Sequence, residues 1–530
     1  IFYTTSKTLL LSLPLLRRSS RDVNSPAPVD CQLSQWSEWT DCFPCQEKKH
    51  RYRTLVQPAR FAGRQCTGHL WDEQACRTEK TCTGPPSCGK DFQCEETGRC
   101  IKRHLVCNGE PDCRDGSDED NCEDEDIESP CEHLFSIPGS EKAVQGYNIL
   151  TQEGRQYIYD PNFFGGHCEY VYNGEWRELK YDAACERLYY GDDEKYFRKP
   201  YNFHIYQFLA HADSGFTFEF YDDSKDLLDA LKSDKSKTKG FTIGIGSTAS
   251  TFHSSFLYLQ EVVFIRGVTK VQTARFKMRR DNIVLDEDVL LSLQELPDTY
   301  NYGMYARFIN DYGTHFITSG TMGGVFEYIL VINKEEMRRK GISNLVTKKR
   351  FLETGRISGA VVEDIIPRIR GGDSSYSGGL LNSWDGNMYR HWGRSLKYNP
   401  AVIDFELQPI HEILRRSNLG NMETKHQHLK RALDDYLLEF NACRCGPCQN
   451  NGEPVLVGNT CFCQCQPGYR GPACEQTKRQ GSKTDGHWSC WSDWSPCQSG
   501  TARRSRHCNN PAPQHGGKPC MGGNLQSKGC

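Results

Sequence analysis

The sequence predicts a multidomain protein in which one large α+β core is flanked on both sides by small disulfide-rich modules. The chain has 530 residues, which is too long for a single hydrophobic core. Of its 27 cysteines, twelve lie between residues 31 and 122 and twelve between residues 443 and 530. Such dense cysteines are typical of modules too small to be held by burial alone. The middle carries only Cys131, Cys168 and Cys185, so packing has to hold it together.

Charge, cysteine content and hydropathy narrow the functional classes. The formal net charge is −3, which argues against a nucleic-acid binder. The many cysteines indicate an oxidising compartment and therefore a secreted protein. No run of 18 or more apolar residues occurs, so the sequence predicts no transmembrane helix.

Residues 1–30 are expected to be the remnant of a signal or propeptide. A short apolar run, Leu9–Leu16, precedes Arg17, Arg18 and Arg21. This is the order of a signal core followed by a basic processing site. The alternative is an amphipathic arm of the mature protein.

Two segments, 31–83 and 486–530, share tryptophans three residues apart followed by alternating arginines. The first has Trp36, Trp39, Arg51 and Arg53, and the second has Trp488, Trp491, Trp494, Arg504 and Arg506. A three-fold turn would stack the indoles in a column, with guanidinium planes between them as cation–π layers. Both segments resemble the thrombospondin type 1 repeat. The resemblance implies C-mannosylation of Trp36, Trp488 and Trp491, and the ladder is either structural only or also a ligand site.

Residues 87–123 carry six cysteines and the string CNGEPDCRDGSDEDNC, in which four carboxylates fall within eight residues. Carboxylates at this density repel one another unless a cation joins them, and oxygen ligands suit calcium. The segment resembles a low-density-lipoprotein receptor class A repeat, in which calcium is structural; a solvated acidic face is the alternative. The family usually has Asp where Asn108 lies and Trp where Leu105 lies. The resemblance implies side-chain ligands Asn108, Asp112, Asp118 and Glu119 and backbone carbonyl ligands Leu105 and Glu110.

Residues 131–442 are expected to form the α+β core. Phe326–Ile332 (FEYILVI) is a β-rich run, and residues 422–440 show one apolar helical face, which we interpret as core packing. The string YARFINDYGTHF at 305–316 resembles the signature of the membrane attack complex/perforin domain. The signature residues are Tyr305, Phe308, Ile309, Tyr312, Gly313, Thr314, His315 and Phe316. With an EGF-like segment at 443–475, the order of modules resembles the late complement components over nearly the whole chain.

The perforin-like resemblance implies a bent antiparallel sheet and helical clusters that can unroll into membrane-inserting hairpins. The alternating residues Phe241, Ile243 and Ile245 are a hairpin candidate. Glycine pairs at 323–324, 371–372 and 378–379 could permit sheet bending or close backbone approach, or could form simple turns. Both hairpin regions look short, because only about twenty residues separate Gly341 from Glu363. A variant that does not insert is therefore an alternative.

The odd cysteine total leaves one thiol without a partner in the chain. Residues 443–474 hold seven cysteines and the last module holds five, so a bridge between these modules would balance both. The surplus falls among Cys131, Cys168 and Cys185. The complement resemblance implies that Cys185 is linked to a separate lipocalin-like chain and that Cys131 pairs with Cys168. A buried free thiol is the alternative.

The resemblance implies a non-enzymatic, secreted subunit of the membrane attack complex. Its expected partners are a disulfide-linked lipocalin-like gamma chain and the beta chain of component eight, the complex of components five, six and seven, component nine, and target-membrane lipid. His411 and Glu412 begin a zincin-like motif, but Arg415 stands where its second histidine belongs, and no nucleophile elbow or phosphate loop occurs. His315, inside the signature, is expected to be structural. The rival classes are a secreted protease and a matrix or adhesion protein.

Overall fold

The computed structural model describes residues 25–530 except for 45, 81–86, 124–128, 130, 182–183, 213–216, 223–226, 228–229, 231–261, 342–361, 374, 376–385, 418, 420–421, 466–468 and 478–483. Several predictions lie outside the described residues. They are most of the segment 1–30, the hairpin candidate Phe241, Ile243 and Ile245, most of the second hairpin region and the glycine pair at 378–379.

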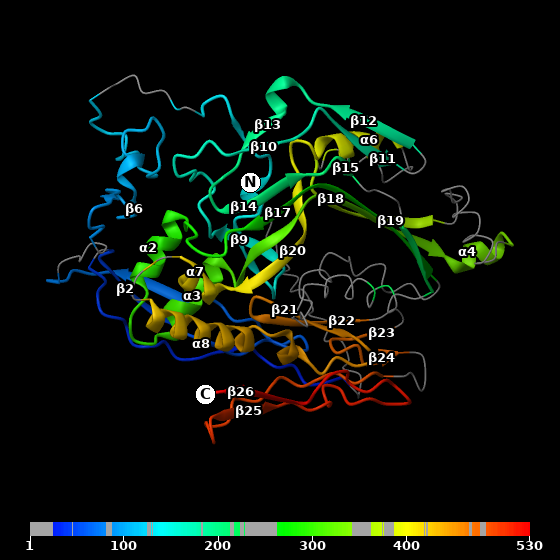
Figure 1. Cartoon of the computed structure of the whole chain (residues 1–530). Helices are drawn as coiled ribbons and strands as arrows, with labels where there is room; N and C mark the ends of the chain where they lie inside the picture. Colours follow the sequence, from blue (N-terminus) through cyan, green and yellow to red (C-terminus); the bar gives the residue numbers. More distant parts are fainter. Residues whose placement is uncertain are drawn as a thin grey trace, which may run out of the picture.

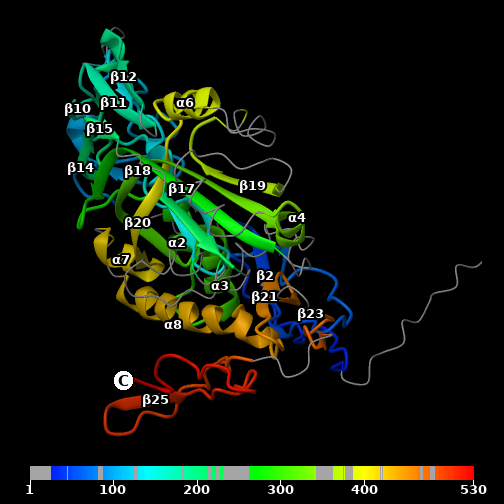
Figure 2. The same ribbon diagram turned by 90° about the vertical axis from the view of Figure 1, so that its right-hand side faces the viewer.

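An antiparallel sheet of eight strands forms the centre of the molecule (Figure 1). Its strand order is β14-β17-β18-β8-β9, with β16 paired to β17 and with β19 and β20 paired to β18. The strands are β8 (Gln145–Asn148), β9 (Glu153–Tyr157), β14 (Phe203–Phe208), β16 (Thr217–Tyr221), β17 (Val262–Met278), β18 (His315–Asn333), β19 (Val362–Arg370) and β20 (Ala401–Pro409). The long strands β17 and β18 are rich in β-branched and aromatic residues and curve visibly in both views (Figures 1 and 2). The predicted bent antiparallel sheet is confirmed.

The partner of β18 changes at the glycine pair Gly323 and Gly324. β20 pairs with β18 up to Gly323, and β19 pairs with it from Val325 onward. Gly323 has a φ of +152°, and a Cβ at this position would lie 1.9 Å from the carbonyl oxygen of Val271. A Cβ on Gly324 would lie 2.6 Å from the Trp392 indole. The prediction of close backbone approach at this pair is confirmed.

The second predicted glycine pair, Gly371 and Gly372, directly follows β19. Their φ angles are +74° and +73°, which an L side chain rarely adopts. A Cβ on Gly371 would lie 2.5 Å from the carbonyl oxygen of Gly323. This pair therefore combines a turn with a close approach to the sheet.

Helices α2 (Glu287–Glu295), α3 (Tyr302–Tyr312), α7 (Ile413–Arg416) and α8 (Glu423–Glu439) pack on one end of the sheet (Figures 1 and 2). The largest apolar cluster forms there and includes Leu429, Leu433 and Tyr436 of α8, so the apolar helical face is core packing as interpreted. Asn301 caps α3 by accepting the N–H of Met304. Among the described helices, none is both long and apolar enough to cross a membrane.

The opposite end of the core carries two small sheets and a helix. The sheets are β10-β13-β7 and β12-β11-β15. Their strands are β7 (Phe135–Ser136), β10 (Tyr170–Tyr172), β11 (Trp176–Tyr181), β12 (Ala184–Tyr189), β13 (Tyr196–Arg198) and β15 (His211–Ala212). The remaining core elements are α4 (Lys334–Arg339), α6 (Gly386–Ser395), η2 (Ser140–Lys142), η3 (Asp192–Glu194) and η6 (Ile410–Glu412). Trp392 and Tyr389 of α6 pack against Phe326 of β18.

The flanking modules are built from short strands and packed against the core. The first holds β1 (Gln32–Leu33), β2 (Lys48–Tyr52), β3 (Leu55–Gln57) and β4 (Trp71–Ala75), and the second holds β5 (Phe92–Gln93), β6 (Cys100–Ile101) and η1 (Arg103–Leu105). After α8 come η7 (Ala442–Cys445), β21 (Glu453–Val457), β22 (Thr460–Gln464), β23 (Tyr469–Arg470), β24 (Gln476–Thr477), β25 (Thr501–Ser505) and β26 (Leu525–Gly529). The last module lies along α8, where Lys528 is 3.7 Å from Asp434 (Figure 2).

Candidate functional site

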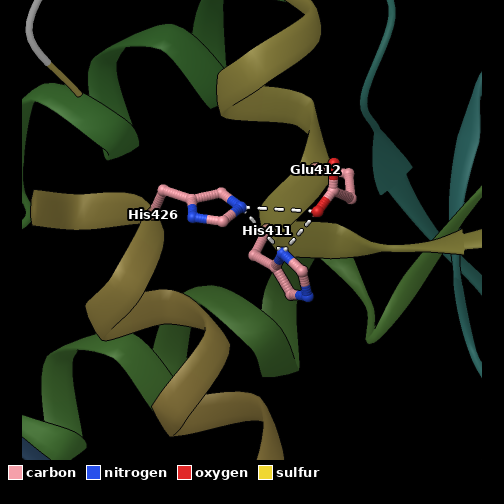
Figure 3. Close-up of side chains that lie close together, drawn as sticks. All are labelled: His411, Glu412 and His426. Atoms are coloured by element: carbon pink, nitrogen blue, oxygen red, sulfur yellow. Dashed lines mark hydrogen bonds and ion pairs between the residues drawn. The ribbon is translucent and has the colours of Figure 1, made fainter. Parts of the chain in front are cut away.

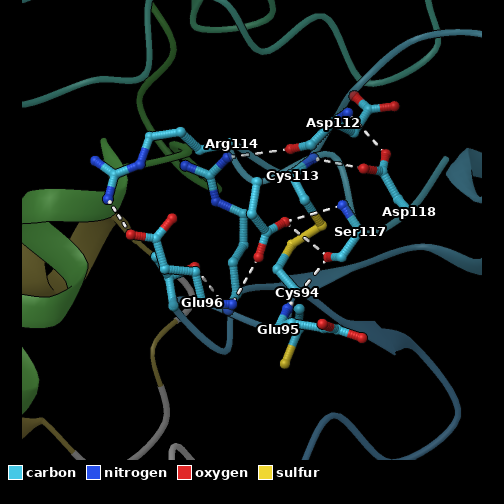
Figure 4. Close-up of a disulfide and its surroundings, with 12 residues drawn as sticks. Cys94, Glu95, Glu96, Asp112, Cys113, Arg114, Ser117 and Asp118 are labelled. Carbon is cyan, nitrogen blue, oxygen red and sulfur yellow. Dashed lines mark hydrogen bonds and ion pairs between the residues drawn. A yellow bond between two sulfur atoms is a disulfide. The ribbon is translucent and has the colours of Figure 1, made fainter. Parts of the chain in front are cut away.

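Backbone amides hold the carboxylates of the predicted calcium loop, residues 105–119. Asp118 is fully buried and accepts the N–H groups of Asp112 at 2.7 Å and Cys113 at 3.2 Å (Figure 4). Glu119 accepts the N–H groups of residues 108 and 109 at 3.0 and 2.9 Å. These bonds gather the predicted side-chain ligands into one compact loop.

Asp112 is the electrostatic centre of this loop. Burial raises the pKa of its carboxyl to about 6, and the charges of Asp118 and Glu110 act in the same direction. The side-chain amide of Asn108, which donates to Asp112 at 3.1 Å, acts against them. A cation beside these oxygens would offset both burial and repulsion. The donor set, made of carboxyl and amide oxygens, fits a hard cation such as calcium.

The side chains of the two predicted carbonyl ligands point to other partners. Leu105 belongs to an apolar cluster with Ile101 and Phe163. The Glu110 carboxylate accepts two hydrogen bonds from Arg198 of β13. Both residues are therefore compatible with a backbone role, and the six proposed ligands remain predictions.

A buried ion-pair network fixes this module to the core. The Arg99 guanidinium lies 2.7 Å from Asp160 and 3.2 Å from Glu287, the first residue of α2. Glu287 also accepts the hydroxyl of Thr97 at 2.6 Å and the backbone N–H of Arg114 at 2.9 Å. Every charge in the network is paired, which is the condition for burying it without a large cost. The metal loop is therefore held in a fixed position on α2.

The family signature forms the junction between α3 and β18. All of its residues are buried in the core, namely Tyr305, Phe308, Ile309, Tyr312, Gly313, Thr314, His315 and Phe316. Gly313 ends α3 with a φ of +96° and turns the chain into the strand. Burial lowers the pKa of His315 to about 3, with His411 adding to the effect, so its imidazole stays neutral. This environment suits the structural role expected for His315.

Cys185 lies on β12 in a hairpin with β11. Its strand partner is Lys180, and its side chain lies outside the described residues. At the base of the hairpin, Trp176 and Tyr189 are strand partners with exposed fractions of 39% and 70%. The neighbouring sheet of β10 and β13 exposes three more tyrosines, Tyr170, Tyr172 and Tyr196. An exposed aromatic surface therefore adjoins the hairpin that carries the predicted interchain cysteine.

The disulfides bear out two predictions about cysteine pairing. Cys131 is bonded to Cys168, and Cys443 of the EGF-like module is bonded to Cys490 of the last module. Twelve disulfides are found in the described part of the chain. The cysteines outside this set are Cys45, Cys82 and Cys185, whose side chains the structure does not describe.

The predicted cation–π ladders are present in the first and last modules. In the first, the Arg51 guanidinium lies 4.7 Å from the Trp36 ring centroid and 4.5 Å from that of Trp39. In the last, the ladder consists of Trp488, Arg506, Trp491, Arg504 and Trp494, with separations between 4.3 and 5.3 Å. The layered packing is confirmed, whereas C-mannosylation of Trp36, Trp488 and Trp491 stays a prediction.

Sequence reasoning missed a cluster formed by His411, Glu412 and His426 (Figure 3). His411 and Glu412 stand in η6, directly after β20, and His426 stands in the first turns of α8. Burial lowers the pKa of His411 to about 4, so its imidazole is neutral at physiological pH. The available signal was the pair His411-Glu412 followed by a histidine near the start of the predicted helix, but their proximity depends on how α7 and α8 fold back.

Four domain families match the chain. Residues 141–446 match the MAC/Perforin domain, and residues 86–122 match the low-density lipoprotein receptor domain class A. Residues 448–476 match the EGF-like domain of complement C8 alpha, C8 beta and C6 components. Residues 34–82 and 486–530 match the thrombospondin type 1 domain. Both the core and its flanking modules are thereby assigned to families.

Curated relatives match the chain over its length. The complement component C8 alpha chain of Oryctolagus cuniculus is 53% identical over 577 residues, covering 100% of this chain and 99% of that protein. The complement component C8 beta chain of Mus musculus is 32% identical, covering 96% of this chain and 92% of that protein. Complement component C6 of Bos taurus is 33% identical, covering 97% of this chain and 58% of that protein. The first alignment is longer than the 530 residues of this chain, so that relative has residues that this chain lacks.

Proposed function

Because the chain belongs to the MAC/Perforin family and is a homologue of complement C8 alpha chains, we propose that it is a secreted subunit that joins the nascent membrane attack complex on a target membrane. There it seeds assembly of the pore. The observation that carries the proposal is the full-length identity to a C8 alpha chain together with the same order of modules. The alpha-chain identity predicted from the module order and the surplus cysteine agrees with this relative.

The finer partners follow from the same identity. They are a lipocalin-like gamma chain linked through Cys185, the beta chain of component eight, the complex of components five, six and seven, component nine, and membrane lipid. The support for the gamma-chain link is the position of Cys185 on the β11–β12 hairpin beside exposed aromatic residues. Such residues supply contact area at low entropic cost.

The disulfide link is tested by gel electrophoresis. The chain is secreted together with the gamma chain, as wild type and as Cys185→Ser, and is compared with and without reductant. We expect the wild type to migrate as a covalent pair that reductant separates, and the variant to migrate alone. A Cys131→Ser control should keep the covalent pair, because Cys131 pairs within the chain with Cys168. Wild type that migrates alone without reductant contradicts the link.

The membrane step is assigned to hairpins released from the core. The side chains proposed to face lipid are Phe241, Ile243 and Ile245, which alternate as a membrane-spanning strand requires. Release of dye from liposomes loaded with components five to seven, followed by this chain with its partner chains and component nine, tests insertion. We expect release with the full set, and Phe241→Asp with Ile243→Asp should reduce it by placing charge in hydrocarbon.

A second candidate function is a subunit that assembles without inserting. It is favoured by one observation, namely that the aligned C8 alpha relative has residues that this chain lacks. In the liposome experiment such a subunit would join the assembly in sedimentation without releasing dye. A matrix or adhesion protein, the other alternative, would neither sediment with the liposomes nor release dye.

The chain is proposed to act without catalysis and to use calcium structurally. Its relatives are complement components, and its class A repeat is of a known calcium-binding type. Asn108, Asp112, Asp118 and Glu119, with the carbonyls of Leu105 and Glu110, would hold the ion. C-mannosylation of Trp36, Trp488 and Trp491 completes the proposal, and mass spectrometry of tryptic peptides tests for a hexose on each indole.

A further inference from the structure

From the cluster of His411, Glu412 and His426 we infer a binding site for a divalent transition-metal ion, with zinc as the preferred occupant. Three side-chain atoms meet at one point, Nδ1 of His411, Nε2 of His426 and Oε1 of Glu412 (Figure 3). The His411–His426, His411–Glu412 and His426–Glu412 separations are 3.1, 3.2 and 3.4 Å. Each of the three ligand atoms is therefore about equally far from the other two.

These separations match the edges of a coordination tetrahedron. Zinc lies about 2.0 to 2.2 Å from imidazole nitrogen and carboxylate oxygen in tetrahedral sites, which places neighbouring ligand atoms about 3.3 to 3.5 Å apart. An ion could therefore enter the triangle with only small side-chain shifts. Three protein ligands and one open position are also the pattern of sites that keep a water molecule on zinc.

The ligand chemistry separates this site from the calcium loop. Two of the three donors are imidazole nitrogens, which suit zinc and related transition metals, whereas calcium and magnesium take oxygen ligands. His411 and His426 are 8% and 1% exposed, so an ion there would be shielded from competing water. The Glu412 side chain is 29% exposed and supplies one negative charge to the ion.

The surroundings orient the ligands and leave a route to the site. The carboxylate of Glu423 lies 3.8 Å from Nδ1 of His426, on the ring edge opposite the cluster. Metal-binding histidines commonly give their second nitrogen to such a carboxylate. Glu423 is itself held by Arg415 at 3.2 Å and Gln427 at 2.7 Å. A cavity of about 290 Å³ lined by His426, Glu423 and Leu414 opens beside it.

Bound metal would join two separate parts of the core. His411 and Glu412 end the central-sheet strand β20, and His426 begins the helix that leads into the EGF-like module. The alternative is an ordinary network in which one histidine donates to the other and both face Glu412. That network needs no metal, and the experiment below distinguishes the two.

The test uses the full-length chain, stripped of metal with a chelator and then saturated with calcium. Zn²⁺ is titrated by calorimetry, and Co²⁺ is added separately because tetrahedral cobalt gives strong visible absorption. We expect one tight Zn²⁺ per chain and a tetrahedral Co²⁺ spectrum. His411→Gln and His426→Gln should each weaken this affinity at least about 100-fold and abolish the spectrum, and Glu423→Gln should weaken it about 10-fold.

His391→Gln is the matched control, because His391 is exposed on α6 and far from the cluster in the sequence. It should leave Zn²⁺ affinity and the Co²⁺ spectrum unchanged. Circular dichroism checks that each variant is folded. If wild type binds no tight Zn²⁺, or if the His411 and His426 variants bind it as tightly as wild type, the site is refuted. The melting temperature of wild type alone should also rise with Zn²⁺, and an unchanged value counts against the site.

Discussion

Arg198 on β13 holds the Glu110 carboxylate with both of its terminal guanidinium nitrogens, at 2.6 and 2.7 Å. The two side chains are only 8% and 12% exposed, and the guanidinium also stacks 4.0 Å from the Phe164 ring. A two-pronged pair of this kind fixes orientation as well as charge. Because the carbonyl of Glu110 is a proposed calcium ligand, this pair connects the core directly to the metal loop.

Replacing Arg198→Gln should therefore weaken calcium binding although Arg198 is not a proposed ligand. Loss of the pair frees the Glu110 backbone and leaves its carboxylate buried without its cation. We expect the calcium dissociation constant to rise about 10-fold, the size typical of residues that orient metal ligands. Calorimetric titration of Ca²⁺ into the chelator-treated full chain measures it.

Arg275→Gln serves as the control for this experiment, since Arg275 is exposed on β17 and lies outside the module. It removes the same charge and should leave calcium affinity unchanged. Equal affinities for the Arg198 variant and wild type would show that the ion pair does not support the metal loop.

Asp286 gives a prediction about pH. This residue caps α2 by accepting the N–H of Asp288 at 3.0 Å. Burial raises the pKa of its carboxyl to about 6, with repulsion from Asp160 adding to the rise. Between its ordinary pKa of about 3.9 and this value, the folded chain binds more protons than the unfolded chain, so its contribution to stability falls as pH rises.

Asp286→Asn keeps the capping oxygen and removes the charge. We expect the melting temperature of the variant minus that of wild type to increase between pH 5 and pH 7.5. Taking the difference cancels the other titrating groups, which both chains share. A difference that stays constant or shrinks over this range would mean that the carboxyl is not strained by its surroundings.

The ladder of the last module predicts a local loss of stability. Arg506 lies 4.4 Å from the Trp488 ring and 4.3 Å from the Trp491 ring, and it donates to the carbonyl of Gly523. Arg506→Gln should lower the free energy of local opening by about 1 to 2 kcal/mol. Hydrogen exchange of the β25 and β26 amides should accelerate accordingly.

Arg503→Gln is the comparison within the same strand, because Arg503 is exposed on β25 and is not among the arginines of the described ladder. Its exchange rates should match wild type. Equal acceleration in both variants would attribute the effect to lost surface charge instead of ring stacking.

Local patterns in the sequence were enough to predict several features. Cysteine parity predicted the Cys443–Cys490 bridge, because seven and five cysteines cannot pair within their own modules. The three-residue spacing of the tryptophans predicted the stacked rings. The paired glycines marked where β18 exchanges one partner strand for another. Each of these depends on residues that are close in sequence or on counting alone.

Features formed between distant segments could not be predicted. Arg99 meets Glu287 across 188 positions, and nothing in either neighbourhood specifies the other. His426 reaches His411 only because α7 and α8 fold back over the end of β20, and a motif search looks for the second histidine at Arg415 instead. Such contacts depend on the packing of whole elements, which local spacing does not encode.

The Cys443–Cys490 bridge predicts how the last module stays attached after cleavage. Lys478, Arg479 and Lys483 lie between the EGF-like and last modules, so limited trypsin treatment can cut there. The other described disulfides of these two modules each join cysteines on the same side of the cut. On a denaturing gel, the cut wild-type fragment should remain attached until reductant is added. The double variant Cys443→Ser with Cys490→Ser should release it without reductant, because non-covalent contacts such as Lys528 with Asp434 do not survive denaturation. Release of the wild-type fragment without reductant would show that the bridge is absent.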